Sequence, residues 1–126
     1  MRSVVQKRSY GSVEIFWLDS GEAMRRLRVA AGRLVAERSD VAAVYVFGSL
    51  PEGRAVPGSD ADVLILLRES DRRWLDRPVE FAPHFADVGL PVDVFCYTVE
   101  EARANRMASH ALARGVWLAG RTTTPV

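Results

Sequence analysis

The sequence has 126 residues, 48% hydrophobic and 26% charged, which is the size and composition of one compact globular domain. Its 17 Lys and Arg residues and 16 Asp and Glu residues give a formal net charge of +1, which excludes an overall basic field, so nucleic acid is not expected as a direct ligand. A single cysteine, Cys96, excludes an internal disulfide and favours a reducing compartment. No apolar run is long enough for a membrane span, so we expect a cytoplasmic protein without membrane contact.

The first third of the chain predicts a tail, a strand and a helix. Residues 1–12 are polar and predict a flexible tail. Val13–Leu18 is β-branched and aromatic, which is typical of a strand. Asp19 then predicts the N-cap of a helix, and Glu22 stands three residues later, where it would complete a capping box. Apolar residues at intervals of three and four extend this helix to about Arg38.

The middle of the chain predicts two buried strands. Val41–Phe47 and Val63–Leu67 are apolar runs of strand length, separated by a loop that contains two Pro and two Gly residues. Residues 79–88 predict a short or distorted helical segment, because Pro83 interrupts the pattern. This segment would bring the chain back for another strand.

The last third predicts the remaining elements. Residues 92–97 form a strand by their alternation, and residues 99–114 form a helix that starts at a Thr-x-x-Glu capping box and stops at a Gly. A short strand over residues 116–118 would close the sheet edge, and residues 120–126 would be a second flexible tail. The chain therefore predicts a single α/β domain over residues 1–126, with a mixed sheet of four to five strands and helices mainly on one face.

A Gly-Ser turn and a pair of carboxylates stand at the two ends of the central loop. Gly48 lets backbone N–H groups approach a phosphate closely, and Ser49 adds a hydroxyl donor. Asp60 and Asp62 are two residues apart at the entry of the second strand, so both side chains project to the same side. Mg²⁺ accepts such oxygen ligands together with water and substrate phosphates. Together, the Gly-Ser turn and the two carboxylates indicate a metal–nucleotide site, although either feature alone is also typical of an ordinary turn or strand entry.

The spacing of these residues resembles a known signature. A Gly-Ser pair at residues 48–49, ten intervening residues and Asp-Ala-Asp at residues 60–62 are similar to the signature of the DNA polymerase beta-type nucleotidyltransferase superfamily, in particular its minimal nucleotidyltransferases. That family places a third carboxylate on the next core strand, where this chain has Asp93. The order of elements over residues 19–118 is also the family's, so the resemblance covers most of the chain.

The resemblance implies an activity and a role for each site residue. The reaction would transfer a nucleoside monophosphate, most often AMP, from a nucleoside triphosphate such as ATP to an acceptor hydroxyl, with two Mg²⁺ ions as cofactors. Asp60 and Asp62 would bridge the two metals, and Asp93 would complete the site and help deprotonate the attacking hydroxyl. The implied nucleotide-binding residues are Gly48, Ser49 and Ser59.

One departure from the family leaves the biological role open. Minimal members usually carry an Arg at the loop position occupied here by Glu52, and the nearest Arg is Arg54. Such members commonly pair with a small helical protein of the HEPN class, a ribonuclease-type toxin, which predicts an antitoxin role. The alternative is a catalytically idle binding module that neutralises its partner by contact. The sequence also leaves a homo-oligomer open.

Overall fold

A four-stranded mixed sheet forms the centre of the protein, which we describe from a computed structural model covering residues 3–121. The strand order is β5-β4-β3-β6. β3 runs antiparallel to both of its neighbours, and β4 runs parallel to β5. The strands are β3 (Val41–Phe47), β4 (Ala61–Leu67), β5 (Val92–Thr98) and β6 (Val116–Gly120). This confirms the predicted α/β fold and the closing edge strand.

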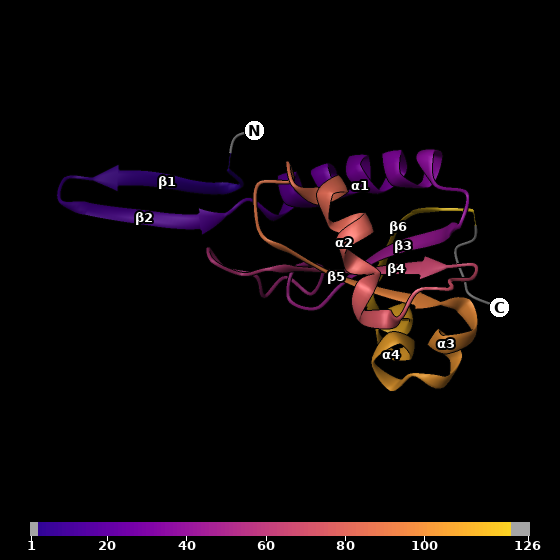
Figure 1. Ribbon diagram of the computed structural model, residues 1–126. Coiled ribbons are helices and arrows are strands. Elements are labelled where there is room, and N and C mark those ends of the chain that lie inside the picture. The colour runs from indigo at the N-terminus through magenta and orange to yellow at the C-terminus, as the bar shows by residue number, and fades with distance from the viewer. Residues whose placement is uncertain (1–2, 122–126) are drawn as a thin grey trace.

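One face of the sheet packs on α1 (Ser20–Glu37), as Figure 1 shows. Leu27, Ala31 and Leu34 of this helix are fully buried against the valines and isoleucine of β3 and β4. Two short turns of helix cover the rest of this face and contribute the buried rings of Phe81 and Phe85. These turns are α2 (Pro78–Phe81) and η2 (Ala82–Phe85), which follow η1 (Trp74–Asp76). The interrupted helix predicted around Pro83 is therefore confirmed.

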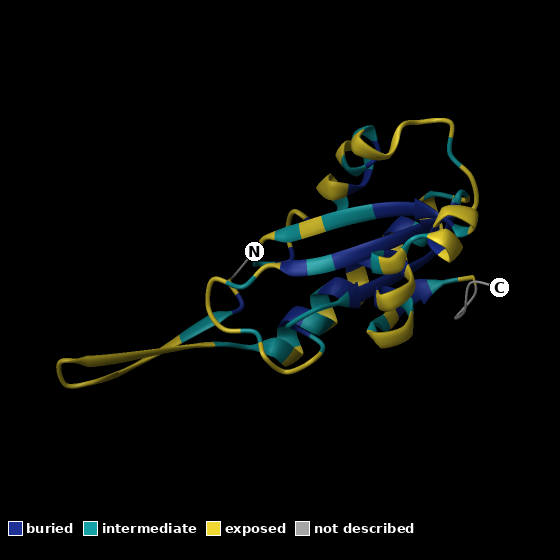
Figure 2. Ribbon diagram, turned by 90° about the horizontal axis from the view of Figure 1, so that it is seen from below, coloured by how far each residue is buried: buried dark blue, intermediate teal, exposed yellow. Residues whose placement is uncertain are grey.

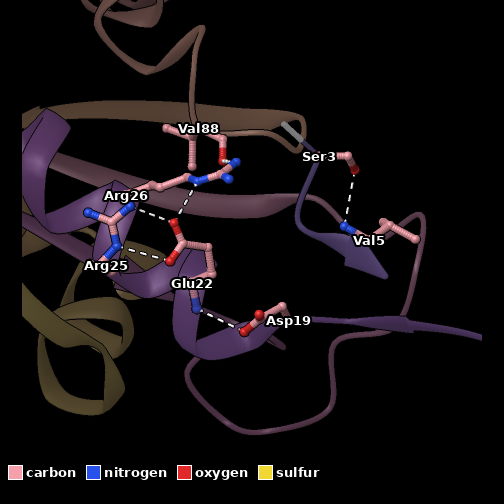
Figure 3. Close-up of polar contacts among 7 residues, drawn as sticks. All are labelled: Ser3, Val5, Asp19, Glu22, Arg25, Arg26 and Val88. Carbon is pink, nitrogen blue, oxygen red and sulfur yellow. Dashed lines mark hydrogen bonds and ion pairs between the residues drawn. The ribbon is translucent and has the colours of Figure 1, made fainter. Parts of the chain in front are cut away.

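The start of α1 is fixed by side-chain contacts (Figure 3). Asp19 accepts a hydrogen bond from the backbone N–H of Glu22 at 3.0 Å, which confirms the predicted N-cap. The predicted capping box is not formed, because the backbone N–H of Asp19 donates to the carbonyl of Val4. The Glu22 carboxylate instead accepts hydrogen bonds from Arg25 and Arg26, which lie within one helical turn of it.

The other face of the sheet packs on α3 (Val99–Ala104) and α4 (Arg106–Arg114), so helices cover both faces rather than mainly one. The reason lies in β4, whose apolar residues point alternately to the two faces and need cover on each. We expected one helix here. The chain breaks at Asn105, whose side chain accepts a hydrogen bond from the N–H of Ala108 at 2.9 Å and so caps a new helix.

An antiparallel hairpin of β1 (Val5–Tyr10) and β2 (Val13–Leu18) projects from the body of the protein (Figures 1 and 2). The prediction of a flexible tail over residues 1–12 is wrong for residues 5–10, which pair with β2 in an unbroken register. Val4, at the base, is fully buried in the α1-side core. Of the second predicted tail, Gly120 is the last residue of β6, and residues 122–126 lie outside the described residues.

Candidate functional site

The predicted site residues meet at one end of the sheet. β3 ends at Phe47, directly before Gly48, and the antiparallel register places Phe47 opposite Asp62 at the start of β4. The parallel register then places Asp62 beside Asp93 on β5. Residues that are far apart in the sequence thus become neighbours through sheet pairing. The predicted association of the Gly-Ser turn with two of the carboxylates is therefore present in the fold.

Strand alternation decides which face carries the carboxylates. On β4, Val63 lies in the α1-side core, whereas Leu64 belongs to the core beneath α3 and α4. Since side chains alternate along a strand, Asp62 shares the face of Leu64. On β5, Asp93 likewise shares the face of Phe95. These two carboxylates thus lie on the α3–α4 face, at the end where β4 and β5 begin.

Gly48 has an unusual backbone conformation and lies in close contact with the side chain of Asp62. Its backbone has φ of +82°, a left-handed conformation that favours glycine. A Cβ atom at this position would stand 2.6 Å from Oδ2 of Asp62, closer than two such atoms approach in folded proteins. The carboxylate of Asp62 therefore occupies the space that any side chain at residue 48 would need. The absence of a side chain at Gly48 is what lets the turn and the carboxylate come together.

The electrostatic state of Asp62 reflects its neighbours. Burial raises the pKa of the Asp62 carboxyl above its ordinary value, and the negative charges of Asp93 and Asp60 raise it further. Asp60 and Asp93 are themselves exposed, whereas Asp62 is half-buried. A cation at this position would offset the repulsion and favour the ionised form of Asp62. The arrangement concentrates negative charge where β4 and β5 begin.

The donor set suits magnesium, but the described residues do not form a closed metal cage. Within residues 3–121, no group of three His, Cys, Asp or Glu side chains is close enough to hold a metal ion by itself. Mg²⁺ is typically held by one or two carboxylates, with waters and substrate phosphates completing its shell. The carboxylates of Asp60, Asp62 and Asp93 therefore fit a metal that arrives together with a phosphate ligand.

The loop after Gly48 is held by local hydrogen bonds. The carbonyl of Ser49 accepts from the N–H of Arg54 at 2.9 Å, and Leu50 is buried in the α1-side core. At the far end of the loop, the Ser59 hydroxyl accepts from the N–H of Val56 at 3.0 Å, and the Ser59 N–H donates to the Val56 carbonyl at 2.9 Å. Ser59 therefore closes a turn directly before the predicted metal-binding residues.

Comparisons with known proteins identify the family and similar folds. A sequence model of the nucleotidyltransferase domain family matches residues 30–118. The chain belongs to this family. A solved structure of a candidate nucleotidyltransferase from Sulfolobus solfataricus has 16% sequence identity and a TM-score of 0.62, over 81% of this chain and 84% of that one. A toxin–antitoxin structure with AMP-PNP has 18% identity and a TM-score of 0.51, over 83% of this chain and 76% of that one. No curated protein matches the chain.

Glu52 stands in the loop where the family resemblance predicts an Arg, and it forms a local ion pair. The Glu52 carboxylate lies 3.1 Å from the guanidinium of Arg54, and both side chains are exposed. Exposed pairs of this kind contribute at most about 1 kcal/mol, so Arg54 is held only weakly. Arg54 is the Arg nearest to this loop position, and its charge is partly neutralised by Glu52.

Sequence reasoning missed the aromatic residues that border the site. Phe47 and Phe95 pack with ring centroids 5.7 Å apart, on the same face as Asp62 and Asp93. They form an apolar boundary between the carboxylates and α3–α4. Alternation along residues 92–97 puts Phe95 on the face of Asp93, but the contact of Phe95 with Phe47 depends on strand order, which the sequence does not give.

A polar hollow of about 530 Å³ lies at the opposite end of β3 and β4. Arg38, Asp40 and Glu80 are among its lining residues, and none of the predicted site residues lines it. Because this hollow is separated from Gly48 by the length of the strands, the two features are distinct. No helix in the described part of the chain is long and apolar enough to cross a membrane.

Proposed function

We propose that this protein transfers a nucleoside monophosphate, AMP by preference, from Mg²⁺-bound nucleoside triphosphate to an acceptor hydroxyl. The observation that carries the proposal is the close approach of Gly48 to Asp62, whose carboxyl also feels the charges of Asp93 and Asp60. A turn without a side chain gives room for phosphate, and the neighbouring carboxylates give oxygen ligands for its metal. Membership of the nucleotidyltransferase domain family supports the same reaction class.

The proposed roles of the residues are those that the family resemblance implies. Asp60 and Asp62 would hold the two metal ions, Gly48 and Ser49 would orient the terminal phosphates, and Ser59 would contribute to nucleotide binding. Asp93 accepts the proton of the acceptor hydroxyl, whose oxygen then bonds to the α-phosphorus while pyrophosphate leaves. Bound magnesium would neutralise the charge that develops on the transferred phosphoryl group. The protein itself contributes positioning and charge neutralisation.

The proposed acceptor lies on a partner protein, a small helical toxin of the HEPN class, which gives this chain an antitoxin role. A fold neighbour is a toxin–antitoxin structure with AMP-PNP, which supports this choice. The second candidate is an idle module that neutralises the partner by contact. It is favoured by the Glu52–Arg54 pair, which occupies the loop where minimal members usually present an Arg.

Calorimetry with ATP tests the metal–nucleotide site. Clustered carboxylates should bind the metal–phosphate complex and repel the free anion, so we expect ATP binding with Mg²⁺ and none with EDTA. Equal affinity in the two conditions would contradict the site.

Asp62→Asn tests the catalytic role separately. The variant should lose transfer activity by more than about a hundredfold, as expected when a charged group at the reacting centre is removed. Its melting temperature should not fall, because the ionised form of Asp62 is already disfavoured by burial and like charges. Asp71→Asn, an exposed carboxylate outside the site, is the control that keeps activity. Early melting with retained activity would instead indicate a structural Asp.

A further inference from the structure

The β1–β2 hairpin projects from the body of the protein, and most of its residues are exposed (Figure 2). The register pairs Tyr10 with Val13 and Arg8 with Ile15, and alternation adds Trp17 to the same face. Tyr10, Val13, Ile15 and Trp17 are 44–56% exposed. The hairpin also lies outside residues 30–118, which match the nucleotidyltransferase family. Its surface is therefore not explained by the transfer site.

The hairpin is smaller than a self-sufficient sheet. Two strands are marginally stable in water, and three or more strands with an apolar face are usually needed. β1 and β2 form a sheet of two strands only, in an unbroken register without a bulge. Both outer edges are therefore straight and available for pairing with another strand.

The charges distinguish the two edges. β1 carries Lys7 and Arg8 at its centre, so antiparallel pairing with β1 of a second copy would place like charges opposite each other. β2 carries Glu14 as its one charged residue. When β2 pairs with β2 of a second copy about Ile15, Glu14 faces Phe16 and no like charges meet. The charge pattern thus disfavours the β1 edge and permits the β2 edge.

We propose that two copies of this chain associate through the outer edges of β2, antiparallel, with Ile15 of each copy opposite Ile15 of the other. A two-fold axis perpendicular to the sheet keeps residues on their own faces, so Val13 of one copy lies opposite Trp17 of the other. The result is a four-stranded sheet, β1-β2-β2-β1, whose two central strands carry Val13, Ile15 and Trp17 of both copies on one face. This register, centred on Ile15, pairs the exposed residues 13–17 of the two copies. Half-buried Leu18, next to the body of the protein, stays outside the new pairing.

Backbone geometry supports this register. The residues that flank a two-residue hairpin turn form a hydrogen-bonded pair, and such pairs alternate along the strands. Val13, Ile15 and Trp17 therefore direct their backbone groups toward β1, and Glu14 and Phe16 direct theirs outward. In the proposed dimer, Glu14 and Phe16 of one copy exchange backbone hydrogen bonds with Phe16 and Glu14 of the other.

Light scattering of the purified full chain over a wide concentration series tests the association. We expect the mass to rise toward twice the 14.0 kDa of one chain. Ile15→Glu should remain monomeric, because two carboxylates would meet at the two-fold axis. The hairpin itself should still form, since Arg8 lies opposite residue 15 and would pair with the new carboxylate. Leu75→Glu, at a 77% exposed apolar residue away from the hairpin, should dimerise normally. A monomeric wild type, or an Ile15→Glu variant that dimerises like the wild type, overturns the proposal.

A cysteine crosslink tests the register even if Ile15→Glu folds poorly. Cys96 is buried, so Ile15→Cys introduces the accessible thiol. Directly opposed residues that are not hydrogen-bonded have Cα atoms about 4.5 Å apart, within the range of a disulfide. Ile15→Cys should crosslink several-fold more than Glu14→Cys, which lies opposite Phe16. Equal yields from the two variants would overturn the register and with it the proposal.

Discussion

Gly48 shows how a single missing side chain organises the site. Two constraints act on it: a left-handed backbone conformation with φ of +82°, and the Asp62 carboxylate at 2.6 Å from the position of a Cβ. Gly53 shares the first constraint, with φ of +75°, but has open space around it. A comparison of the two glycines therefore separates backbone strain from the contact with the carboxylate.

Gly48→Ala should harm ligand binding more than stability. Both Gly48→Ala and Gly53→Ala should lose about 1–2 kcal/mol of unfolding free energy, since alanine is disfavoured at positive φ. Only Gly48→Ala also displaces the flexible carboxylate of Asp62, and it alone should lose Mg²⁺-dependent ATP binding. Urea unfolding and calorimetry on both variants check this. Similar ATP affinities for the two variants would show that Gly48 serves the turn and not the carboxylate.

The start of α3 is fixed by a capping box and a charged pair. Glu101 and Thr98 form the predicted capping box, with the Thr98 N–H donating to Glu101 at 2.9 Å and the Glu101 N–H donating to Thr98 at 3.1 Å. Arg77, directly before α2 and 4% exposed, also donates to the Glu101 carboxylate, and its Nη2 lies 3.0 Å from Oε2. Hydrogen bonding by Arg77 lowers the pKa of Glu101 to about 2.

Glu101→Gln should destabilise the protein in a pH-dependent way. A lowered pKa means that the folded state favours ionised Glu101, so its contribution is present above about pH 4.5 and is lost as the pH falls toward 2. We expect a loss of about 1–2 kcal/mol at pH 7, since buried Arg77 loses a charged partner that solvent partly screens. In urea unfolding, the difference from wild type should shrink as the pH falls through this range. Glu100→Gln, in the same helical turn but outside the contact with Arg77, is the control and should change little.

The elements also show how far the sequence predicts the fold. Periodicity and capping residues predicted the core strands, the α1 N-cap and the α3 capping box, because these depend on local chemistry. The break at Asn105 was missed, since an Asn within a helical pattern caps a new helix only where packing on the sheet lets the chain turn. The β1 strand was missed because its sequence is polar and its pairing with β2 supplies what its composition does not.

The strand order of the sheet, which brings the site residues together, could not be predicted from the sequence. Asp60, Asp62 and Asp93 were predicted to cluster from the family resemblance, and sheet pairing places Asp62 beside Asp93. A ready-made metal cage was not found among residues 3–121. Asp60 and Asp93 are exposed at the end of the sheet that Phe47 and Phe95 border, whereas a small-molecule site usually buries most of its ligand in a concave pocket. A partner protein would supply the missing wall.

Co-expression with a small helical HEPN-type protein, followed by intact-mass analysis with ATP and Mg²⁺, should therefore yield a complex in which the partner gains one nucleoside monophosphate. We expect the footprint on α4 and β6, where Trp117 is 39% exposed. Ala113→Glu on α4 should weaken the complex, and Val29→Glu on α1, the opposite face, should not. Asp62→Asn should keep the complex and lose the adduct. A wild-type complex without adduct would favour the idle binding module. Modification of a small hydroxylated compound by the isolated chain would instead place the acceptor among metabolites, because the site would then need no wall from a second protein.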